Sequence, residues 1–289
     1  MKTSQLFTRD QPVFSFEVFP PRGLTAPNAT QKVCDTLEVL QRVQPDFVSV
    51  TFRNAGLAAK DSTIAIAKLI RDKYGIEPVV HLPAAKLSRG AVDGLLNDLQ
   101  NAGIQNILAL RGDIPATGRT SNDFPFASDL VSYIHTRGDF NVIGACYPEG
   151  HPESADPLAD IQNLKRKVDA GTSELITQLF YDNREFYHFQ ERCRFAGITV
   201  PIEAGIMPLM TAKQAAHMMD GVTIPEKLQA LINRFADKPD ALRDAGIAYA
   251  IDQIVDLLAH RVDGIHLYTM DNPEVAARII EATRNIVRA

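Results

Sequence analysis

Short apolar runs of strand-like composition alternate with amphipathic, helix-like stretches along the whole chain. The runs predict eight strands, at residues 13–19, 47–51, 78–82, 106–110, 141–146, 175–180, 202–206 and 264–268. The stretches between them predict helices, among them residues 30–43, 62–73, 91–102, 160–170, 185–196 and 245–260. Three of these helices lead into Gly103, Gly171 and Gly197, and glycine is the residue that most often follows a helix C-terminus.

Eight strands that alternate with helices in 289 residues predict an α/β fold, a (β/α)8 TIM barrel that spans residues 1–289 as a single domain. The competing fold is a doubly wound open sheet, which usually has a glycine-rich turn after its first strand. Here the first strand leads into Phe19-Pro20-Pro21-Arg22, and the chain contains no G-x-G-x-x-G or Walker pattern. The segment 211–245 is longer than a simple connection, so we expect additional helices in it.

Composition excludes several classes of function. Hydrophobic residues make up 45% of the chain and charged residues 22%, which is ordinary for a soluble globular protein. The net charge is −5 with no basic cluster and no long apolar stretch, so we expect neither nucleic acid nor a membrane as partner. The N-terminus lacks an apolar signal core, and the three cysteines (Cys34, Cys146 and Cys193) fit reduced thiols better than disulfides or a zinc site. We therefore expect a cytoplasmic protein.

Glu17 lies inside the first predicted strand, in an otherwise apolar run that Pro20 and Pro21 end. Burying an unpaired carboxylate is costly, so this side chain must be paired, be neutralised by a raised pKa, or face a cavity. A glutamic acid in apolar surroundings at the end of a strand is suited to donate a proton near neutral pH. The alternative is a solvent-facing glutamate on an edge strand, and the residue pattern alone leaves both open.

Polar residues gather at the C-terminal ends of the predicted strands. They are Glu17, Thr51, His81, Arg111-Gly112-Asp113, Tyr147, Gln178 and Tyr268-Thr269. In a TIM barrel the loops after these ends converge on one rim, which forms the active site. The pattern therefore predicts an active site at this rim.

The segment Arg111-Gly112-Asp113 follows a clear strand. Its glycine would let the backbone approach a ligand closely, and Asp113 could stabilise a cation or accept hydrogen bonds from a heterocycle. An ordinary turn with aspartate as a local cap is the alternative.

The loop 147–153 has the composition of a stiff ligand-binding wall. Tyr147 could stack on a flat ring, and His151 could contact a phosphate or a ribose. His151 with Glu149 and Glu153 could also hold a metal ion, but the spacing matches no ligand motif, so no metal site is predicted.

The helix at 160–170 places Asp160, Asn163 and Lys167 on one face. A solvated face with ion pairs is the simpler interpretation, and a phosphate-binding edge is the alternative. Gln178, at the end of a strand, offers both a donor and an acceptor, which suits a pterin or a carboxamide.

Several motifs then occur in order, from about Phe14 to the last strand. They are Phe16-Glu17-Val18-Phe19-Pro20-Pro21-Arg22, Ser49-Val50-Thr51, His81-Leu82, Leu110-Arg111-Gly112-Asp113, Ala127-Ser128-Asp129-Leu130, Tyr147-Pro148-Glu149 with His151-Pro152-Glu153, Asn163-Leu164-Lys165-Arg166-Lys167-Val168-Asp169-Ala170-Gly171 and Ile176-Thr177-Gln178. Together they resemble the methylenetetrahydrofolate reductase family, in its short bacterial type without a regulatory domain.

The resemblance implies a (β/α)8 flavoprotein that contains FAD. In that family NADH or NADPH reduces FAD, which passes a hydride to 5,10-methylenetetrahydrofolate and so produces 5-methyltetrahydrofolate for one-carbon metabolism and methionine supply. It implies that Glu17 is the general acid that helps open the folate ring, and we predict that its pKa is raised. It also implies that Asp113 contacts the pterin and tunes the electrostatics, and that Gln178 touches folate and nicotinamide in turn.

The resemblance further implies which residues bind the cofactor and the substrate. The FAD contacts or their neighbours would be Thr51, Phe52, His81, Arg111, Gly112, Asp113, Ala127, Tyr147, His151, Asp160, Asn163, Arg166 and Lys167. The substrate contacts would be Asp113, Gln178, Gln214 and Asn272.

Three segments depart from the family pattern. Phe52-Arg53-Asn54-Ala55-Gly56 stands in place of Tyr-Gly-Ala, and Pro83-Ala84 follows His81-Leu82 in place of Thr-Cys. Asn272 stands where the family has a folate-contacting arginine. These departures bear on donor preference and folate affinity, while the acid and the Arg-Gly-Asp turn are retained.

Two other functions stay open. One is another flavin-dependent barrel oxidoreductase, similar to proline dehydrogenase. Glu17 and the Pro-Glu-x-His-Pro-Glu loop argue against this function. The other is a flavin-free barrel that acts as a binding or assembly partner. We expect a homo-oligomer, and no motif decides between NADH and NADPH.

Overall fold

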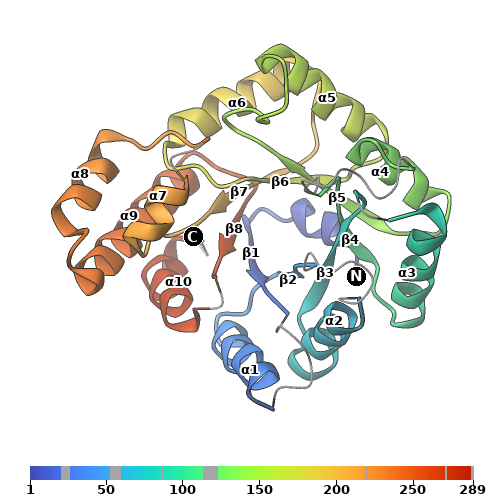
Figure 1. Ribbon diagram of the computed structural model, residues 1–289, viewed down its shortest axis with the longest axis horizontal. Coiled ribbons are helices and arrows are strands. Elements are labelled where there is room, and N and C mark those ends of the chain that lie inside the picture. The colour runs from blue at the N-terminus through green and yellow to red at the C-terminus, as the bar shows by residue number, and fades with distance from the viewer. Residues whose placement is uncertain are drawn as a thin grey trace.

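Eight parallel strands form the centre of the molecule in the computed structural model, which describes residues 1–20, 27–52, 60–85, 87–112, 123–218, 221–270 and 272–287. The strands are β1 (Val13–Val18), β2 (Phe47–Val50), β3 (Glu77–Pro83), β4 (Asn106–Leu110), β5 (Asn141–Cys146), β6 (Glu174–Thr177), β7 (Ile202–Ile206) and β8 (Gly264–Tyr268). Each strand pairs in parallel with its neighbours in chain order, and β1 pairs with β8 to close the barrel (Figure 1). The predicted (β/α)8 barrel is confirmed.

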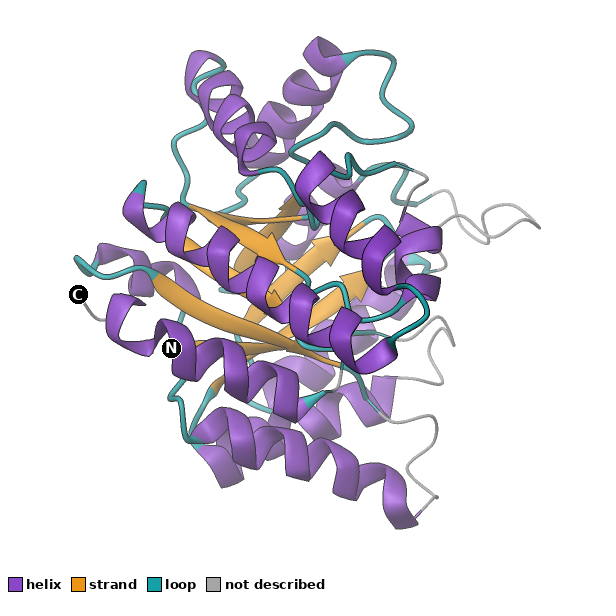
Figure 2. Cartoon of the chain, turned by 90° about the vertical axis from the view of Figure 1, so that its left-hand side faces the viewer, coloured by secondary structure: helices purple, strands orange, loops and turns teal. Residues whose placement is uncertain are grey.

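The helices surround the strands (Figures 1 and 2). They are α1 (Pro27–Gln41), α2 (Lys60–Tyr74), α3 (Arg89–Asn101), α4 (Ala127–His135), α5 (Pro157–Asp169), α6 (Asn183–Phe195), α7 (Ala212–Met218), α8 (Glu226–Phe235), α9 (Pro239–Ala259) and α10 (Pro273–Val287). Helices α7 and α8 are the additional helices expected in 211–245. None of the described helices has the length and apolar composition needed to cross a membrane.

Strand β6 is shorter than the predicted strand at 175–180, and Thr177 explains where it stops. The Thr177 hydroxyl accepts the N–H of Gly205 at 2.8 Å, and the Thr177 carbonyl accepts the hydroxyl of Tyr268 at 2.6 Å. These side-chain bonds replace the ladder that would continue β6 along β7. The other strand boundaries agree with the prediction within one residue.

The barrel interior is closed at its N-terminal end by a short 3-10 helix, η1 (Thr3–Thr8), which the sequence analysis did not predict. Leu6 of η1 packs inside the barrel with residues from six strands: Val13, Phe47, Val79, Leu108, Ile143 and Ile176. Thr3 is buried and donates its backbone N–H to Asn106 at 2.9 Å and its hydroxyl to Glu174. The bottom of the barrel is therefore sealed, which leaves the C-terminal end as the open one.

A second, larger apolar layer lies between the strands and the surrounding helices, where the outward side chains of the strands meet the inward faces of the helices. The three cysteines are free, as expected. Cys146 and Cys193 are buried in this layer.

Candidate active site

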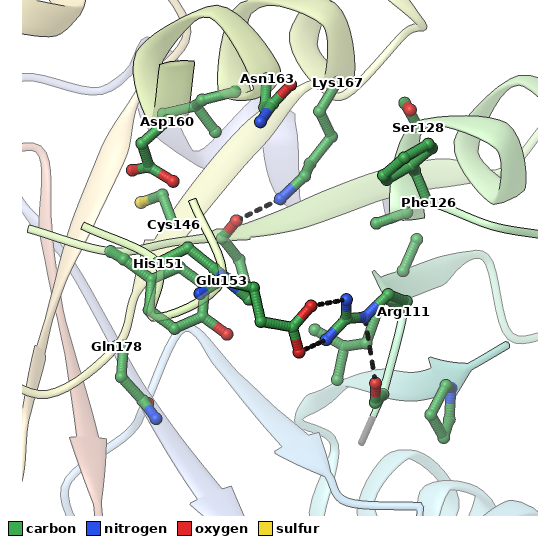
Figure 3. Close-up of a pocket in the computed structure, with 18 of the residues that line it drawn as sticks. Arg111, Phe126, Ser128, Cys146, His151, Glu153, Asp160, Asn163, Lys167 and Gln178 are labelled. Carbon is green, nitrogen blue, oxygen red and sulfur yellow. Dashed lines mark hydrogen bonds and ion pairs between the residues drawn. The ribbon is translucent and has the colours of Figure 1, made fainter. Parts of the chain in front are cut away.

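A cavity of about 630 Å³ opens at the C-terminal ends of β2 to β6 and extends to the start of α4 and along α5 (Figure 3). Its wall includes thirteen residues that the sequence analysis singled out: Thr51, Phe52, His81, Arg111, Gly112, Ala127, Tyr147, His151, Asp160, Asn163, Arg166, Lys167 and Gln178. They come from segments up to 127 residues apart in the chain (178 − 51). The expected gathering of polar residues at this rim is therefore observed.

Other lining residues are not among the predicted site residues. They are Pro83, Ala109, Leu110, Phe126, Ser128, Ala145, Cys146, Pro152, Glu153, Ser154 and Leu164. Most are apolar or small, and Leu110, Ser128, Pro152, Glu153 and Leu164 belong to the motifs quoted for the family. Glu153 ends the Pro-Glu-x-His-Pro-Glu loop, a position at which the sequence suggests a metal ligand and not the partner of Arg111.

Gly112 shapes the wall after β4. Its φ is +80°, and a Cβ at this position would lie 2.8 Å from Cβ of Pro83. The carbonyl of Arg111 accepts the N–H of Ala85 at 2.7 Å, so the ends of β3 and β4 are joined next to this glycine. The turn requires glycine for both its backbone conformation and its close approach to Pro83.

Arg111 reaches across the cavity to Glu153 (Figure 3). Its two terminal nitrogens donate to the two carboxylate oxygens at 2.5 and 2.7 Å. This bidentate geometry fixes the plane of the guanidinium. Arg111 is thus held at the wall, with a carboxylate from the loop after β5 as its partner.

Tyr147 and His151 form an aromatic corner in the same loop. Their ring centroids are 4.6 Å apart in an edge-to-face arrangement, and Nδ1 of His151 accepts the N–H of Glu153 at 3.1 Å. Burial and the neighbouring Arg111 lower the pKa of His151, so its imidazole is neutral at pH 7. The corner offers flat, uncharged surfaces to a ligand.

Helix α5 presents its polar face to the cavity, and Asp160, Asn163 and Lys167 all line it. Lys167 donates from Nζ to the carbonyl of Ala145 at 2.6 Å (Figure 3). Burial lowers the pKa of Lys167. Asp160 accepts the hydroxyl of Ser154 at 2.8 Å. This face therefore borders a ligand-sized space, which favours the phosphate-binding alternative over a purely solvated face.

Glu17 does not line the cavity itself but stands behind its wall. Glu17 is 8% exposed, and its Oε2 lies 3.7 Å from Nε2 of the cavity-lining His81. Burial lowers the pKa of His81 to about 3, so this imidazole is neutral. Nε2 of His81 and Oγ1 of Thr51 are buried and have no hydrogen-bond partner among the described residues. Such atoms are rare in proteins, and they are suited to take a polar ligand group or a water as partner.

Gln214 and Asn272 do not line the cavity. Gln214 accepts the N–H of Met210 at 2.9 Å and donates to the carbonyl of Pro208 at 3.1 Å, so it braces the loop after β7. Asn272 accepts the N–H of Val275 at 3.2 Å at the start of α10. Asp113, like the segment 53–56, lies outside the described residues.

The cavity combines three cationic side chains (Arg111, Arg166 and Lys167), an aromatic corner and two polar atoms that have no hydrogen-bond partner among the described residues. Cations suit phosphate groups, and flat rings suit a heterocycle. Its volume is in the range of ligand-binding pockets. The arrangement suits an anionic ligand with aromatic rings, next to a buried carboxyl group that can serve as an acid.

The chain resembles known proteins over nearly its full length. The sequence profile of the family "Methylenetetrahydrofolate reductase" matches residues 2–284. The chain is 36% identical over 268 residues to the 5,10-methylenetetrahydrofolate reductase of Escherichia coli (strain K12), which covers 92% of the chain and 88% of that protein. It is 34% identical over 296 residues to "Methylenetetrahydrofolate reductase (NADH) 1" of Arabidopsis thaliana, which covers 96% of the chain and 49% of that protein.

A solved structure from Clostridium thermocellum shares the fold. It is described as an uncharacterized protein that binds two copies of 5-methyl-5,6,7,8-tetrahydrofolic acid. It superimposes on the chain with a TM-score of 0.69 over the full length of both, at 13% identity. At this identity the similarity shows a common fold.

Proposed function

The chain belongs to the methylenetetrahydrofolate reductase family, and on that premise we propose that it reduces 5,10-methylenetetrahydrofolate to 5-methyltetrahydrofolate with FAD as cofactor and NADH or NADPH as electron donor. The observation that carries the proposal is the cavity. Its wall contains most of the residues that the family motifs assign to FAD, and one of them, His81, lies beside Glu17.

The cavity fits FAD by the chemistry of its donors. FAD, when bound, supplies the hydride carrier between the nicotinamide and the folate. Lys167 and Arg111 are suited to its phosphates, and the Tyr147–His151 corner is suited to a flat ring. Nε2 of His81 and Oγ1 of Thr51 would gain the hydrogen-bond partners that they lack among the described residues.

Glu17 supplies the proton. The methylene bridge of the folate accepts a hydride poorly until one of its C–N bonds breaks, and protonation of the ring nitrogen promotes that step. A general acid of this kind contributes about 10²- to 10⁴-fold to the rate. Because His81 is neutral, no imidazolium beside Glu17 favours its ionised form.

Gln178 and Asp113 complete the substrate side of the proposal. Gln178 lines the cavity on the side away from the Arg111–Glu153 pair (Figure 3). Its amide can both donate to and accept from a pterin or a carboxamide, and Asp113 would stabilise the cationic form of the opened folate. Gln214 on α7 and Asn272 in the loop after β8 would act on the folate side.

The direct test is optical. The purified protein should show a flavin absorbance band, which NADH or NADPH bleaches under anaerobic conditions and which methylenetetrahydrofolate then restores. The oxidised product of a proline-like amino acid is the comparison substrate. If this compound restored the band and the folate did not, the chain would be an amino-acid oxidoreductase. A colourless protein that takes up no added FAD would overturn the proposal and favour a binding or assembly role.

A further inference from the structure

Tyr268, the last residue of β8, reaches across one strand of the barrel to the end of β6. Its hydroxyl donates to the carbonyl oxygen of Thr177 at 2.6 Å. Strand β7 lies between β6 and β8, so the tyrosine side chain crosses β7 to make this bond (Figure 1). Tyr268 does not line the cavity, and no step of the proposed reaction uses it.

Strands β6 and β7 separate just before this bond. Their paired register ends with Ile176 opposite Glu203. At the next position the N–H of Gly205 donates to the hydroxyl of Thr177 at 2.8 Å, which leaves the Thr177 carbonyl for another donor. The Tyr268 hydroxyl is that donor, since a carbonyl oxygen can only accept.

Gly205 leaves room for the tyrosine side chain. A Cβ at this position would collide with the carbonyl oxygen of Thr177, and it would lie 2.8 Å from Cε2 of Tyr268. Any other residue here would displace the ring or the carbonyl group. The crossing therefore depends on the glycine of β7 as well as on the tyrosine of β8.

The Thr177 carbonyl belongs to the peptide bond that leads into Gln178, and this peptide is held at both ends. The Tyr268 hydroxyl binds its oxygen, and its N–H donates to the carbonyl of Cys146 on β5 at 2.7 Å. Because a peptide group is planar, these two bonds fix the plane from which Cα of Gln178 extends. The ends of β5 and β8 together set the orientation of Gln178.

The side chain of Gln178 depends on this backbone anchor. The side chain lines the cavity and is exposed. Among the described residues its amide has one polar contact, with the N–H of Leu179 at 3.4 Å, which is long for a hydrogen bond. Since no described side chain is hydrogen-bonded to the amide, its position follows from that of the peptide.

Tyr268 also stands opposite Glu17. The two residues are partners in the register of β1 and β8, and the hydroxyl of Thr269 donates to the carbonyl of Glu17 at 2.8 Å. The end of β8 is thus bound to the strand of the proposed acid on one side and to the backbone at Gln178 on the other.

We propose that Tyr268 is a positioning residue, which holds Gln178 in a fixed place relative to Glu17 through the Thr177 carbonyl. This inference rests on the proposed function, in which Gln178 contacts the folate and the nicotinamide and Glu17 is the acid. Tyr268 touches neither ligand in this assignment and acts only through Gln178. Its effect on the reaction must therefore vanish when the Gln178 side chain is absent.

The kinetic test is a double-mutant cycle between Tyr268→Phe and Gln178→Ala. Tyr268→Phe keeps the ring and removes only the hydroxyl, so KM for methylenetetrahydrofolate should rise about 3- to 10-fold, the effect of one lost hydrogen bond. In the Gln178→Ala background the same change should alter KM by less than about twofold. Additive losses would show that the hydroxyl acts on the fold in general and would overturn the proposal, as would a parental KM in Tyr268→Phe.

The matched control is Tyr249→Phe. The Tyr249 hydroxyl donates to the carbonyl of Tyr181 at 2.7 Å, in the segment that follows Gln178, but neither tyrosine lines the cavity. Both phenylalanine variants lose a hydrogen bond to a backbone carbonyl in residues 177–181 and should unfold at a lower urea concentration than the parent. Only Tyr268→Phe should change KM, and an equal rise in Tyr249→Phe would contradict the proposal.

An NMR spectrum of the ligand-free protein tests the anchor without turnover. In protein that contains isotopically labelled glutamine, the side-chain signals of Gln178 are identified by their loss in Gln178→Ala. They should shift in Tyr268→Phe and stay in place in Tyr249→Phe, and unshifted signals in Tyr268→Phe would overturn the proposal. If they shifted but the parent failed to reduce the folate, the proposed function would fail while the positioning of Gln178 by Tyr268 would still stand.

Discussion

Nε2 of His81 lies 3.7 Å from Oε2 of Glu17, and both side chains are almost completely buried. This distance is longer than a hydrogen bond, and a neutral imidazole forms no ion pair. His81 therefore places a polar but uncharged group between Glu17 and the cavity. A carboxyl group in such surroundings is suited to hold a proton until a ligand needs it.

The substitution Glu17→Gln removes the proposed acid and keeps its shape. Reoxidation of the reduced flavin by methylenetetrahydrofolate should slow by about 10²- to 10⁴-fold, because the folate ring is no longer protonated. Reduction of the flavin by NADH or NADPH, followed in the same stopped-flow instrument, serves as the internal control and should be retained. Folate turnover at the parental rate would show that another group is the acid.

The substitution Lys167→Met removes a cation from the cavity. A hydrogen bond to a charged group contributes about 1.5–3 kcal/mol, so the dissociation constant for FAD should rise about 10- to 100-fold. The stability of the ligand-free protein should not fall, because burial already disfavours the charged form of Lys167. Lys165→Met, on the same helix but paired with Asp169 at the surface, should change neither quantity. Equal FAD affinity in both variants would exclude Lys167 as a phosphate ligand.

The substitution Gly112→Ala tests the shape of the wall. Its positive φ costs about 1–2 kcal/mol for a residue with a Cβ, and the new methyl group would collide with Pro83. The free energy of unfolding, measured with urea, should therefore fall by at least this amount, and FAD should bind more weakly. Gly90→Ala in α3, where a Cβ meets no atom within 4 Å, should be neutral or stabilising by up to about 1 kcal/mol. If Gly112→Ala changed neither the stability nor FAD binding, the turn would not require glycine.

His81 should make the fold sensitive to acid. Its pKa is about 3 in the folded state and about 6.5 when unfolded, so it takes up a proton on unfolding below pH 6.5. The stability that it contributes is present above pH 6.5 and decreases as the pH falls, by about 2 kcal/mol at pH 5. The free energy of unfolding of His81→Gln should therefore depend less on pH than that of the parent between pH 7.5 and 5. His188→Gln at the surface should keep the parental dependence, and an identical dependence in His81→Gln would contradict the assignment.

Glu174 should have the opposite dependence. Burial raises its pKa from 4.5 to about 7, so between these values the unfolded state releases a proton that the folded state keeps. Folding is therefore disfavoured as the pH rises from 4.5 to 7, by about 3 kcal/mol in total. Glu174→Gln should gain stability relative to the parent at pH 8 but not at pH 4.5, as measured by urea unfolding. Glu191→Gln at the surface is the control, and a pH-independent difference in Glu174→Gln would show that Glu174 is ionised throughout.

Local sequence patterns were sufficient for the order of the elements. A strand such as Asn106–Leu110 and its following turn at Gly112 can be recognised without knowing their partners, because apolar runs and glycine act through the local backbone. The predicted helix at 160–170 also holds, although α5 begins three residues earlier at Pro157. The helix η1 was missed because its six residues form a lid whose stability comes from packing in the barrel.

Many of the residues that line the cavity could be named from the sequence, but their geometry could not. Thirteen of the expected residues line one cavity, eight of them after parallel strands, whose C-terminal ends meet at one rim, and five of them on α4 and α5. The Arg111–Glu153 pair and the Glu17–His81 approach join residues 42 and 64 positions apart (153 − 111 and 81 − 17), and no local pattern specifies such pairs. Gln214 and Asn272 were also expected at the site because each matches a family position. In the structure both make hydrogen bonds to nearby backbone groups.

The barrel, the family and the rim on which the polar residues gather could all be predicted before folding is considered, because hydrophobic periodicity and ordered motifs are properties of the chain alone. Only the folded structure shows which titratable groups are neutral and which polar atoms come into contact. Burial of His81, Glu203 and His266 sets their protonation, and burial exists only after eight strands have closed around them. The Tyr268 hydroxyl reaches the Thr177 carbonyl only because β6 and β8 lie on either side of β7 in the closed barrel.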